Sequence, residues 1–431
     1  MTITKNFLLE TELKSYKTAL LVGVYFATDE KKNCEDNLDE LERLGDTFGL
    51  QTVGKVSCPL KKIDAGTFLG KGKLEELKVM AETQGAAVIL FDEEISPHQQ
   101  RNLEEIFKKP VVDRTELIIE VFAQRAQSRE ARLQIELAKV KYQFPRLRRL
   151  WTHLSRQTAG GGAFLKGEGE KQIEIDRRLL RRRLDRLQEE IEEVKAQRET
   201  QRSARLRSGI PTFAIVGYTN AGKSTLLRAM TKADVLVEDK LFATLDTTTR
   251  KYLLPNRQEV LLIDTVGFIR KLPHTLVAAF RSTLEEAIHT DILLHLVDIS
   301  SKTVESQTEA ACAVLQELHL QDQPSIMVLN KIDQCQQPLI INKMRVKYPK
   351  TVAISAKTGE GFEDLIEMML TELKSLRKIV KLRIPQSHYA LISEIMREGN
   401  VIFSEYEEND VLMEVEIPTR LEYKVQSFLH G

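Results

Sequence analysis

Blocks of apolar residues alternate with amphipathic stretches in the first part of the chain. Residues 18–26 (TALLVGVYF) and 86–93 (AAVILFDE) have the continuous apolar character of buried strands. Residues 33–49 and 96–109 instead place apolar residues at helical spacing between charged ones. Short strand and helix units of this kind predict a small α/β domain built on a parallel sheet.

A different period follows, in which apolar residues are separated by steps of four and three. One series runs from Leu133 to Leu154 and a second from Leu180 to Val194. Matching seams predict two long helices, and the five glycines between them disfavour a helix, so an antiparallel hairpin with a flexible tip is expected. Pro145 should kink or interrupt the first helix. An arm of about 22 residues would project roughly 33 Å.

Strand and helix patterns resume near Ile210 and continue to about Leu376. The apolar segments TFAIVG, VLLIDT, ILLHLVD, SIMVLNK and TVAISA predict the strands of a doubly wound sheet. After them, three strand-like segments and two helical ones predict a small α+β domain in which a Glu-Asn-Asp turn joins a hairpin. The predicted organisation is an N-terminal α/β domain (1–116), a helical hairpin (117–208) with a glycine-rich loop (158–170), a doubly wound domain (209–376) and an α+β domain (377–431).

Composition narrows the class of protein. A chain of 431 residues that is 42% hydrophobic is long enough for about three domains with cores of their own. No uncharged apolar run reaches the roughly 18 residues of a membrane span, and the start MTITKNFLLETELK carries acids where a signal peptide would be apolar. The 4 cysteines lack metal-site spacing, which favours a reducing compartment. We expect a cytoplasmic monomer.

The formal charges sum to zero but are unevenly distributed. From Arg125 to Arg207 there are 22 Lys and Arg residues against 12 Asp and Glu, a surplus of ten. A charge run usually marks a solvated helix face. Here the basic residues, within Arg146–Arg156 and Arg177–Arg186, lie on a projecting arm beside a glycine-rich tip, which favours contact with nucleic acid phosphates, preferably of RNA. Trp151 is interpreted as a seam residue and not a base stacker.

The segment GYTNAGKS, which ends at Ser224, has the spacing of a phosphate-binding loop. It matches G-x-x-x-x-G-K-[ST] directly after one predicted strand and directly before a predicted helix, the context that the motif requires. Gly217 and Gly222 would let backbone N–H groups surround phosphates. Lys223 would carry charge to the β and γ phosphates, and Ser224 can ligate Mg²⁺.

Two further segments complete a nucleotide switch. Asp264 in DTVG ends an apolar strand, where it can hold the water shell of Mg²⁺, and Gly267 can present its backbone N–H to the γ phosphate. Thr248 in LDTTTR is expected in a loop, with its hydroxyl on Mg²⁺ only while a γ phosphate is present. Thr247 and Thr249 are rivals for this role. The predicted catalytic residues are Lys223, Thr248 and Gly267, and the predicted metal ligands are Ser224, Thr248 and Asp264.

Two loops at later strand ends indicate the base. NKID follows the strand SIMVL, and SAK follows the strand TVAI. Asp333 as a bidentate acceptor matches the ring N–H and exocyclic amine of guanine, a pattern that adenine lacks, so GTP is predicted over ATP. The predicted nucleotide contacts are Gly217, Tyr218, Thr219, Asn220, Ala221, Gly222, Lys223, Ser224, Thr225, Phe242, Ala243, Thr244, Asp264, Gly267, Asn330, Lys331, Asp333, Ser355, Ala356 and Lys357.

Phe268 occupies the position after Gly267, where many GTPases keep a glutamine that orients the attacking water. A phenyl ring accepts no hydrogen bond from water, so intrinsic hydrolysis is expected to be slow until a partner intervenes. The alternative interpretation is that Phe268 packs the switch.

The chain resembles the HflX family of ribosome-associated GTPases over nearly its whole length. The segments that carry the resemblance are GKGKLEEL, SPHQQRNLEEIF, VVDRTELIIEVFAQRA, GEGEKQIEIDRRLLRRR, GYTNAGKSTLL, LFATLDTTTR and DTVGFIRKLPHTLVAAFRSTLEEA. The resemblance implies a central Ras-like P-loop GTPase domain that uses GTP, GDP and Mg²⁺. It also implies binding to the large ribosomal subunit and the intact ribosome, a hairpin loop that reaches towards the peptidyl transferase centre, and GTP-dependent splitting of stalled or stressed ribosomes, with the ribosome as activator.

Two departures from the family pattern are present. The family loop reads Gly-Pro-Gly-Glu-Thr-Gln, whereas Glu168 and Lys171 stand here for the Pro and the Thr. Thr247 replaces the Pro of an Asp-Pro-Thr switch. We expect the first change to alter the fit of the loop against ribosomal RNA and the second to loosen the first switch. Subunit maturation and a GTP-gated protein adaptor remain alternative functions.

Overall fold

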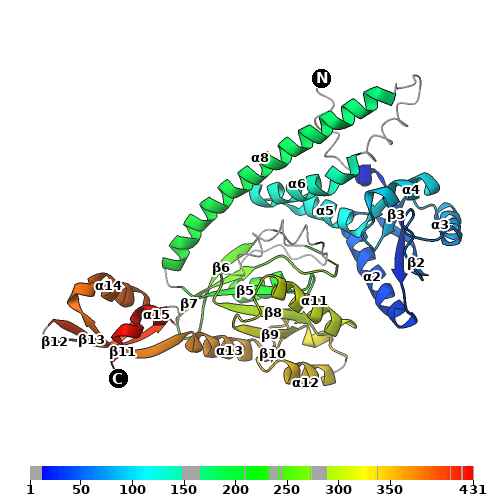
Figure 1. The fold of residues 1–431 in the computed structure, drawn as a ribbon. Helices are drawn as coiled ribbons and strands as arrows, with labels where there is room; N and C mark the ends of the chain where they lie inside the picture. The colour runs from blue at the N-terminus through cyan, green and yellow to red at the C-terminus, as the bar shows by residue number, and fades with distance from the viewer. Residues whose placement is uncertain are drawn as a thin grey trace. The chain divides into compact units, whose positions relative to one another are not determined.

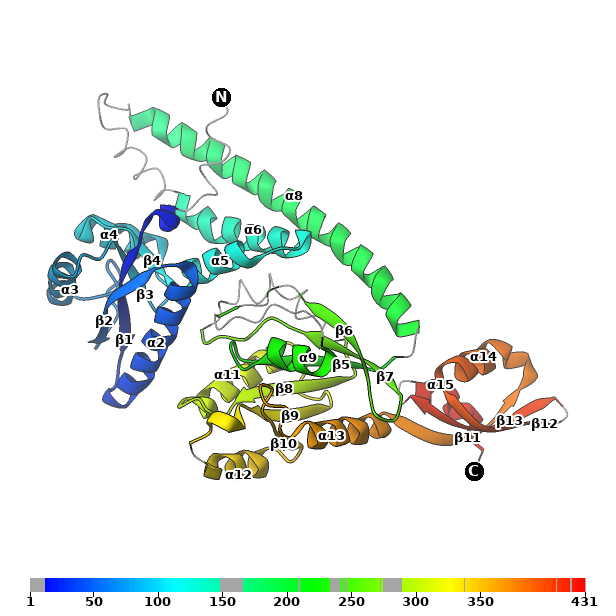
Figure 2. The same cartoon turned by 180° about the vertical axis from the view of Figure 1, so that it is seen from behind.

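A computed structural model describes the protein over residues 12–147, 166–207, 210–232, 241–242, 245, 247–271, 273, 289–336, 338–407, 409–418 and 421–430. Its contacts divide the chain into two compact units (Figure 1, Figure 2). The N-terminal unit comprises the described residues of Met1–Lys195, Leu236–Asp246 and Val266–Leu284. The C-terminal unit comprises those of Ala196–Val235, Thr247–Thr265 and Glu285–Gly431.

The N-terminal unit contains a four-stranded sheet in the order β2-β1-β3-β4, with every neighbouring pair parallel. The predicted parallel sheet is therefore confirmed. Strand β2 escaped the sequence pattern because most of its side chains are only half-buried, so its apolar residues form no continuous run. The strands are β1 (Thr18–Tyr25), β2 (Gln51–Pro59), β3 (Val88–Phe91) and β4 (Val111–Asp113).

Helices cover both faces of this sheet (Figure 1). One apolar cluster joins Leu21 of β1 to Leu41 of α2 and Leu117 of α5. A second cluster joins Ile89 of β3 to helices α3 and α4 on the opposite face. The predicted boundary at 116/117 falls inside α5, whose apolar side chains belong to the first cluster. The elements are η1 (Glu12–Ser15), η2 (Thr28–Glu30), α2 (Lys31–Phe48), α3 (Lys71–Thr83), α4 (Pro97–Phe107) and α5 (Arg114–Arg125).

The helical hairpin has the predicted seam. Helix α6 (Arg129–Gln143) packs against α8 (Lys166–Arg207) through an apolar cluster. The helices run antiparallel, because Arg183 of α8 pairs with Glu136 while Arg177, earlier in α8, lies over the ring of Phe144. Pro145 interrupts α6 as predicted, within the 3-10 turn η3 (Phe144–Arg146). The cluster comprises Leu133, Leu137, Val140, Phe144, Leu147, Leu180, Leu184, Leu187, Ile191 and Val194.

The glycine-rich segment differs from its prediction at one end. Helix α8 begins at Lys166, so residues 166–170, with Gly167 and Gly169, are helical although they were predicted to lie in the loop. Each glycine costs a helix only about 1 kcal/mol, and a helix of 42 residues propagates through two such positions near its start. Trp151 and the rest of the predicted loop lie outside the described residues.

The C-terminal unit contains a six-stranded sheet in the order β10-β9-β8-β5-β7-β6. One apolar cluster joins the sheet to helices α9 and α13, and another joins it to α11 and α12, as expected for a doubly wound domain. The elements are β5 (Thr212–Gly217), α9 (Lys223–Thr231), β6 (Thr248–Leu253), β7 (Glu259–Asp264), β8 (Ile292–Asp298), α11 (Val304–Glu317), β9 (Ser325–Asn330), η4 (Ile332–Gln334), α12 (Pro338–Lys347), β10 (Thr351–Ala353) and α13 (Phe362–Ser375).

Thr248 opens the edge strand β6 and does not lie in a loop, which corrects the sequence-based expectation. Strand β6 runs antiparallel to β7, and Thr248 is the register partner of Asp264. The strand was missed because its side chains are half-buried or exposed, and an edge strand needs no continuous apolar run.

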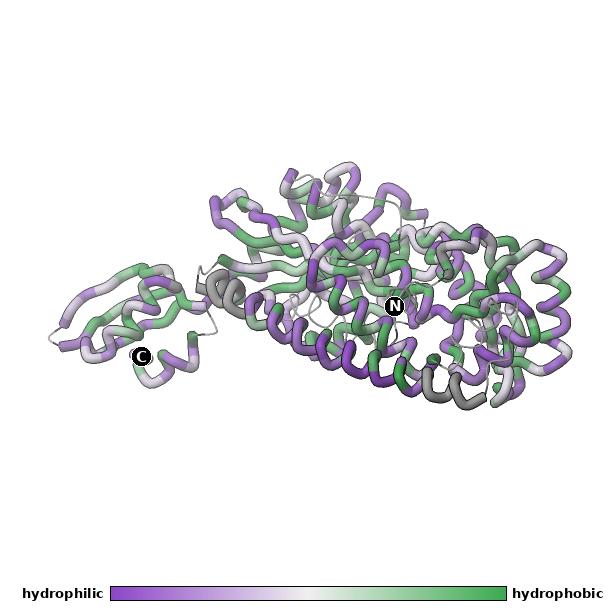
Figure 3. Tube along the Cα trace, turned by 90° about the horizontal axis from the view of Figure 1, so that it is seen from above, coloured by the Kyte–Doolittle hydropathy of each residue, from purple (hydrophilic) through white to green (hydrophobic). Residues whose placement is uncertain are grey.

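The α+β domain that ends the chain has its own core. Its antiparallel sheet has the order β11-β13-β12, and the predicted hairpin between β12 and β13 is confirmed. Figure 3 shows that polar and apolar residues are mixed in this domain, and that the coloured part of α8 is largely hydrophilic. In the described parts of the chain, no helix is both long enough and apolar enough to cross a membrane. The elements are β11 (Arg377–Pro385), η5 (Gln386–His388), α14 (Tyr389–Glu398), β12 (Asn400–Glu407), β13 (Asp410–Pro418), α15 (Glu422–Val425) and η7 (Gln426–Phe428).

Candidate nucleotide-binding site and basic hairpin

The predicted phosphate-binding loop connects the end of β5 to the start of α9. Gly217 has a φ of 147°, and a Cβ atom there would lie 2.2 Å from the carbonyl oxygen of Leu296 on β8. Gly222, the N-cap of α9, has a φ of 94°. These two positions need glycine for backbone conformation and for close approach, which leaves the N–H groups of the loop at the N-terminus of α9.

The side chain of Lys223 folds back onto the phosphate-binding loop that precedes it. Its side chain is buried, and its ammonium group donates hydrogen bonds to the carbonyl oxygens of Gly217 at 3.2 Å and Tyr218 at 2.8 Å. Burial lowers the pKa of Lys223 to about 8, and the nearby carboxylate of Asp264 opposes this shift. An ammonium group held at this position suits the binding of nucleotide phosphates.

The three predicted metal ligands are close together in the C-terminal unit. The hydroxyl group of Ser224 donates to Oδ2 of Asp264 at 2.7 Å, and Asp264 is fully buried. Thr248 lies opposite Asp264 in the register of β6 and β7. Hard oxygen ligands of this kind suit Mg²⁺.

Asn330 links the two predicted guanine loops to the phosphate loop. Its side-chain nitrogen donates to the carbonyl oxygen of Ala221 at 2.8 Å, and its side-chain oxygen accepts from the N–H of Ala356 at 2.9 Å. Asn330 is therefore a structural tie between NKID, SAK and the phosphate loop. Asp333, in η4, and Lys357 are exposed, as direct contacts with a base require.

Three residues around this site were not identified from the sequence. His295 on β8 is buried, and burial together with the charge of Lys223 lowers its pKa to about 4. Asp298, at the end of β8, accepts from the ammonium group of Lys331 at 2.6 Å. Thr265 donates to the carbonyl oxygen of Ile215 at 2.8 Å, which fixes the chain after Asp264. The sequence signal for Asp298 was its position at a strand end, whereas His295 gave none.

Thr219, Asn220, Thr225 and Ser355 lie in the C-terminal unit, whereas the other predicted contacts belong to the N-terminal unit or lie outside the described residues. Phe242 is buried, and its ring packs edge-on against Phe122 of α5 with centroids 4.4 Å apart. Contact of Phe242 with nucleotide therefore stays a prediction that concerns its backbone. Gly267 also groups with the N-terminal unit, and its role stays a prediction. Ala243 and Thr244 lie outside the described residues.

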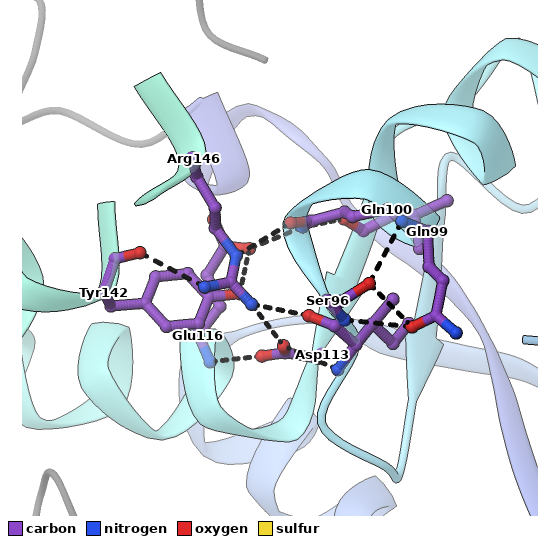
Figure 4. Close-up of polar contacts among 9 residues, drawn as sticks. Ser96, Gln99, Gln100, Asp113, Glu116, Tyr142 and Arg146 are labelled. Carbon is purple, nitrogen blue, oxygen red and sulfur yellow. Dashed lines mark hydrogen bonds and ion pairs between the residues drawn. The ribbon is translucent and has the colours of Figure 1, made fainter. Parts of the chain in front are cut away.

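Arg146 follows α6 and ties this end of the first hairpin helix, where the chain leads towards the predicted loop, to the N-terminal sheet (Figure 4). Its guanidinium group donates to Gln100 Oε1 at 3.0 Å, to the carbonyl oxygen of Ile95 at 2.6 Å and to Asp113 Oδ2 at 3.3 Å. It also stacks 3.7 Å from the ring centre of Tyr142. Burial raises the pKa of Asp113 to about 6 although Arg146 opposes the shift. Arg146 was grouped with the RNA-facing arginines, but it is buried and acts within the fold.

The first half of α8 carries an exposed basic surface. Arg183 is held by Glu136 and Arg186 by Glu190, while the neighbouring arginines are exposed. The basic surface comprises Arg177, Arg178, Arg181, Arg182 and Arg186. The exposed charged residues that follow Arg186 are acidic, namely Glu189, Glu192 and Glu193, and the exposed Asp185 precedes Arg186. Within α8, the net positive charge thus lies in the part nearer to its N-terminus.

Three family models match most of the chain. The model described as GTP-binding GTPase N-terminal matches residues 35–123, and GTP-binding GTPase Middle Region matches residues 125–205. The model described as 50S ribosome-binding GTPase matches residues 212–331, which include the phosphate loop and Asn330.

Curated proteins similar to this chain are named GTPase HflX. The protein of Chlamydia pneumoniae is 47% identical over 414 residues, covering 95% of this chain and 88% of that protein. The protein of Escherichia coli (strain K12) is 41% identical over 404 residues, covering 93% of each. Among solved structures, a GTP-binding protein of the archaeon Sulfolobus solfataricus in complex with GDP is similar, with a TM-score of 0.44, 24% identity and coverage of 84% of this chain and 99% of that one.

Proposed function

This chain belongs to the HflX family of GTPases, and from that premise we propose that it binds the large ribosomal subunit and splits stalled ribosomes while it carries GTP. The observation that carries this proposal is the presence, in one chain, of an ordered phosphate loop and an exposed row of arginines on a long helical arm. Membership of the family makes the chain a GTPase that binds GTP and GDP. The ribosome supplies a polyanion that matches the arginine row.

Mg²⁺ is proposed as the cofactor of the nucleotide. Ser224, Thr248 and Asp264 would hold it, because the Ser224 hydroxyl hydrogen-bonds to Asp264 and Thr248 is the register partner of Asp264. When bound, the ion would neutralise charge on the β and γ phosphates. Lys223 would add a second positive charge at the phosphates. Asp333 would select guanine through its ring N–H and exocyclic amine.

The switch is proposed to hydrolyse GTP slowly until the ribosome acts on it. Phe268 is 2% exposed, so its ring packs in the interior, and it offers no acceptor for the attacking water. Thr248 and Gly267 are the residues that would respond to the γ phosphate. In other GTPases a glutamine orients the attacking water, and an activator that orders these segments would provide that orientation here. The group that positions the water would then belong to the ribosome or to a rearranged switch.

The arginines on α8 are proposed to contact ribosomal RNA. Arg178, Arg181 and Arg182 are exposed on the same half of the helix and none of them is drawn into the apolar seam. Arginine binds phosphate oxygens through a planar fork of donors, which suits a folded RNA surface. The protein would act as a monomer in the cytoplasm, partly associated with ribosomes. A role in subunit maturation or as a GTP-gated adaptor would use the same switch with a different partner.

Light scattering by intact ribosomes would test this function. We expect scattering to fall when the protein is added with GTP or a non-hydrolysable analogue and to stay constant with GDP. Lys223→Ala should abolish the effect, because the variant loses the ammonium group of the phosphate loop. Lys251→Ala is the matched control, since Lys251 forms only an exposed pair with Glu259. Equal splitting with GDP and GTP would contradict the proposal, and subunit binding without splitting would favour the maturation role.

A further inference from the structure

Strand β12 forms one edge of the antiparallel sheet near the end of the chain. The order β11-β13-β12 leaves it paired with β13 on one side only (Figure 1). Ile392 and Ile395 of α14 and Val425 of α15 belong to the core that covers one face of this sheet. Among the described side chains of β12, that core includes only Val401, which is partly buried. The rest of the strand therefore extends beyond the core that stabilises the domain.

The side chains of β12 are exposed from Ile402 to Glu407, whichever face of the sheet they lie on. Three of them are large and hydrophobic, since Ile402 is 54% exposed, Phe403 55% and Tyr406 67%. Tyr406 lies opposite the buried Val411, on the side of the helices, whereas Phe403 lies on the other face. Hydrophobic side chains along an unpaired strand edge favour pairing with another chain. The edge of β12 thus has the character of an interface.

The charge of the strand indicates which partner can pair with it. Glu405 and Glu407 follow Phe403 at alternate positions, so all three side chains share one face of the sheet. Arg383 of β11 pairs with Glu407 at 3.7 Å and with Asp410 at 2.7 Å, so one cation serves two carboxylates. In the described part of the chain, Glu405 forms no ion pair. The excess of negative charge at this edge attracts a basic strand and repels RNA.

A second copy of this chain does not fit the same edge. Pairing of two β12 strands about a two-fold axis would bring Glu405 and Glu407 of one copy beside the same residues of the other. Like charges on neighbouring strands are destabilising, and charged side chains on edge strands prevent self-pairing. The bulge between Val401 and Phe403 also increases the local twist of the strand, which leaves residues 403–407 as the part available for pairing.

We propose that residues 403–407 dock an extended, basic segment of another protein, which adds a fourth strand to this sheet. Every second residue of an edge strand directs its N–H and C=O away from the neighbouring strand, and these groups bind the backbone of the added segment. Lysine or arginine side chains of the segment lie beside Glu405 and Glu407, and the stem of one of them covers Phe403. Side chains on its other face contact Tyr406. This interaction goes beyond the proposed function, because it requires neither nucleotide nor ribosome.

Binding of a synthetic peptide to the full-length protein tests the docking. The probe is a short fluorescent peptide of alternating lysine and valine with blocked ends, which places its lysines on one face of an added strand. A peptide of alternating glutamate and valine is its counterpart. We expect fluorescence anisotropy to show saturable binding of the lysine peptide and none of the glutamate peptide. Failure of the lysine peptide to bind, or equal binding of both peptides, would overturn the proposal.

Substitutions on β12 locate the site. Glu405→Lys should weaken binding of the lysine peptide by about threefold or more, because it reverses the charge beside the added strand. Glu105→Lys is the matched control, since Glu105 is exposed on α4 and the net charge changes equally. Phe403→Ser should also weaken binding, whereas Tyr423→Ser, at an exposed position of α15, should not. Equal affinities of the β12 variants and their controls would overturn the proposal. All four side chains are exposed, so the unfolding midpoints should stay near that of the wild-type protein.

RNA and a second copy of the chain are the competing occupants of the edge. A labelled single-stranded RNA should bind the wild-type protein and Phe403→Ser alike, and weaker binding to the variant would overturn the proposal. Sedimentation velocity should show the same species for both proteins, and a dimer that Phe403→Ser dissociates would overturn it as well. No ribosome is present in these experiments, so their outcome is separate from that of ribosome splitting.

Discussion

His295 is a buried histidine whose neutral form the fold requires. It lies on β8 beside the strand that leads into the phosphate loop, with Val216 as its register partner. Burial, with the charge of Lys223, depresses its pKa from 6.5 to about 4. Between these two pH values, the imidazole of His295 is protonated in the unfolded chain but stays neutral in the folded chain. The free energy of unfolding due to His295 is therefore fully present above about pH 6.5 and is lost as the pH falls towards 4.

His295→Gln should remove this part of the acid sensitivity. The interval between the two pKa values corresponds to about 3 kcal/mol of differential stability, so the wild-type protein should lose more thermal midpoint between pH 6.5 and 4 than the variant does. Above pH 7 the two midpoints should differ by a constant amount. The measurement is the apparent unfolding midpoint of the full chain as a function of pH.

His430→Gln is the control for this experiment. His430 is exposed and its backbone N–H, not its ring, bonds to Lys381. The difference between the unfolding midpoints of the wild-type protein and this control should not reproduce the difference expected for His295→Gln. Parallel curves for His295→Gln and the wild-type protein below pH 6.5 would contradict the burial of a neutral histidine at this position.

At the scale of single residues, the sequence predicted the phosphate loop but not the contacts that other side chains make within the fold. Gly217, Gly222 and Lys223 follow from a local motif, because their roles depend on neighbours within eight positions. Asn330 belongs to a recognisable motif, but the nitrogen and the oxygen of its side-chain amide form hydrogen bonds with backbone groups of two other loops. Only folding brings these loops together. Arg146 was predicted as a surface cation, and its burial depends on Asp113, which is 33 positions away.

At the scale of elements, burial determines what the sequence could predict. Strands β5 and β8 are buried along their length and were predicted with the bounds that the structure has. Strands β2 and β6 are half-exposed, so their apolar residues gave no signal. The hairpin seam was predicted in full over its described residues because two helices with matched periods can bury it only against each other. The start of α8 was predicted too late in the chain, because the glycine content of the segment was taken as evidence against a helix, whereas the helix continues through Gly167 and Gly169.

The apolar seam between α6 and α8 leads to a prediction about the stability of these two helices. Leu187 of α8 is fully buried against α6, so Leu187→Ala should destabilise the hairpin by about 2–5 kcal/mol and expose both helices to protease. Leu179→Ala on the same helix is the matched control, because Leu179 is 50% exposed and should cost far less. Limited proteolysis with mapping of the cut sites in 129–143 and 174–195 measures the difference. Equal cleavage of the two variants would mean that the seam does not hold the hairpin.

At the scale of the whole molecule, the switch segments divide between the two units. Thr248 and Asp264 group with the phosphate loop, whereas Gly267, Arg270 and Lys271 group with the N-terminal sheet. The sequence predicted the domains as consecutive blocks, because composition and periodicity report only on neighbours along the chain. Contacts such as that of Lys271 with Asp92, 179 positions apart, carry no local signal. The division of the switch segments between the two units is therefore a property of the fold.

The distribution of charge along α8 makes a prediction for the interaction of the whole molecule with the large ribosomal subunit. Binding through phosphates releases counterions, so affinity falls linearly with the logarithm of salt concentration. Replacing Arg178, Arg181 and Arg182 by Gln should weaken binding and reduce the magnitude of this slope by about three, one for each phosphate contact that is lost. Co-sedimentation with purified large subunits in the presence of a GTP analogue, over a series of salt concentrations, measures the slope.

The acidic part of the same helix provides the matched control. Asp185→Asn with Glu189→Gln and Glu193→Gln also changes three exposed charges on α8, so the length, fold and seam of the hairpin are preserved to the same degree. This variant should keep the wild-type slope, because carboxylates make no phosphate contacts. If the arginine variant keeps the wild-type slope as well, the basic surface is only a solvated helix face, and the ribosome must be bound by another part of the molecule.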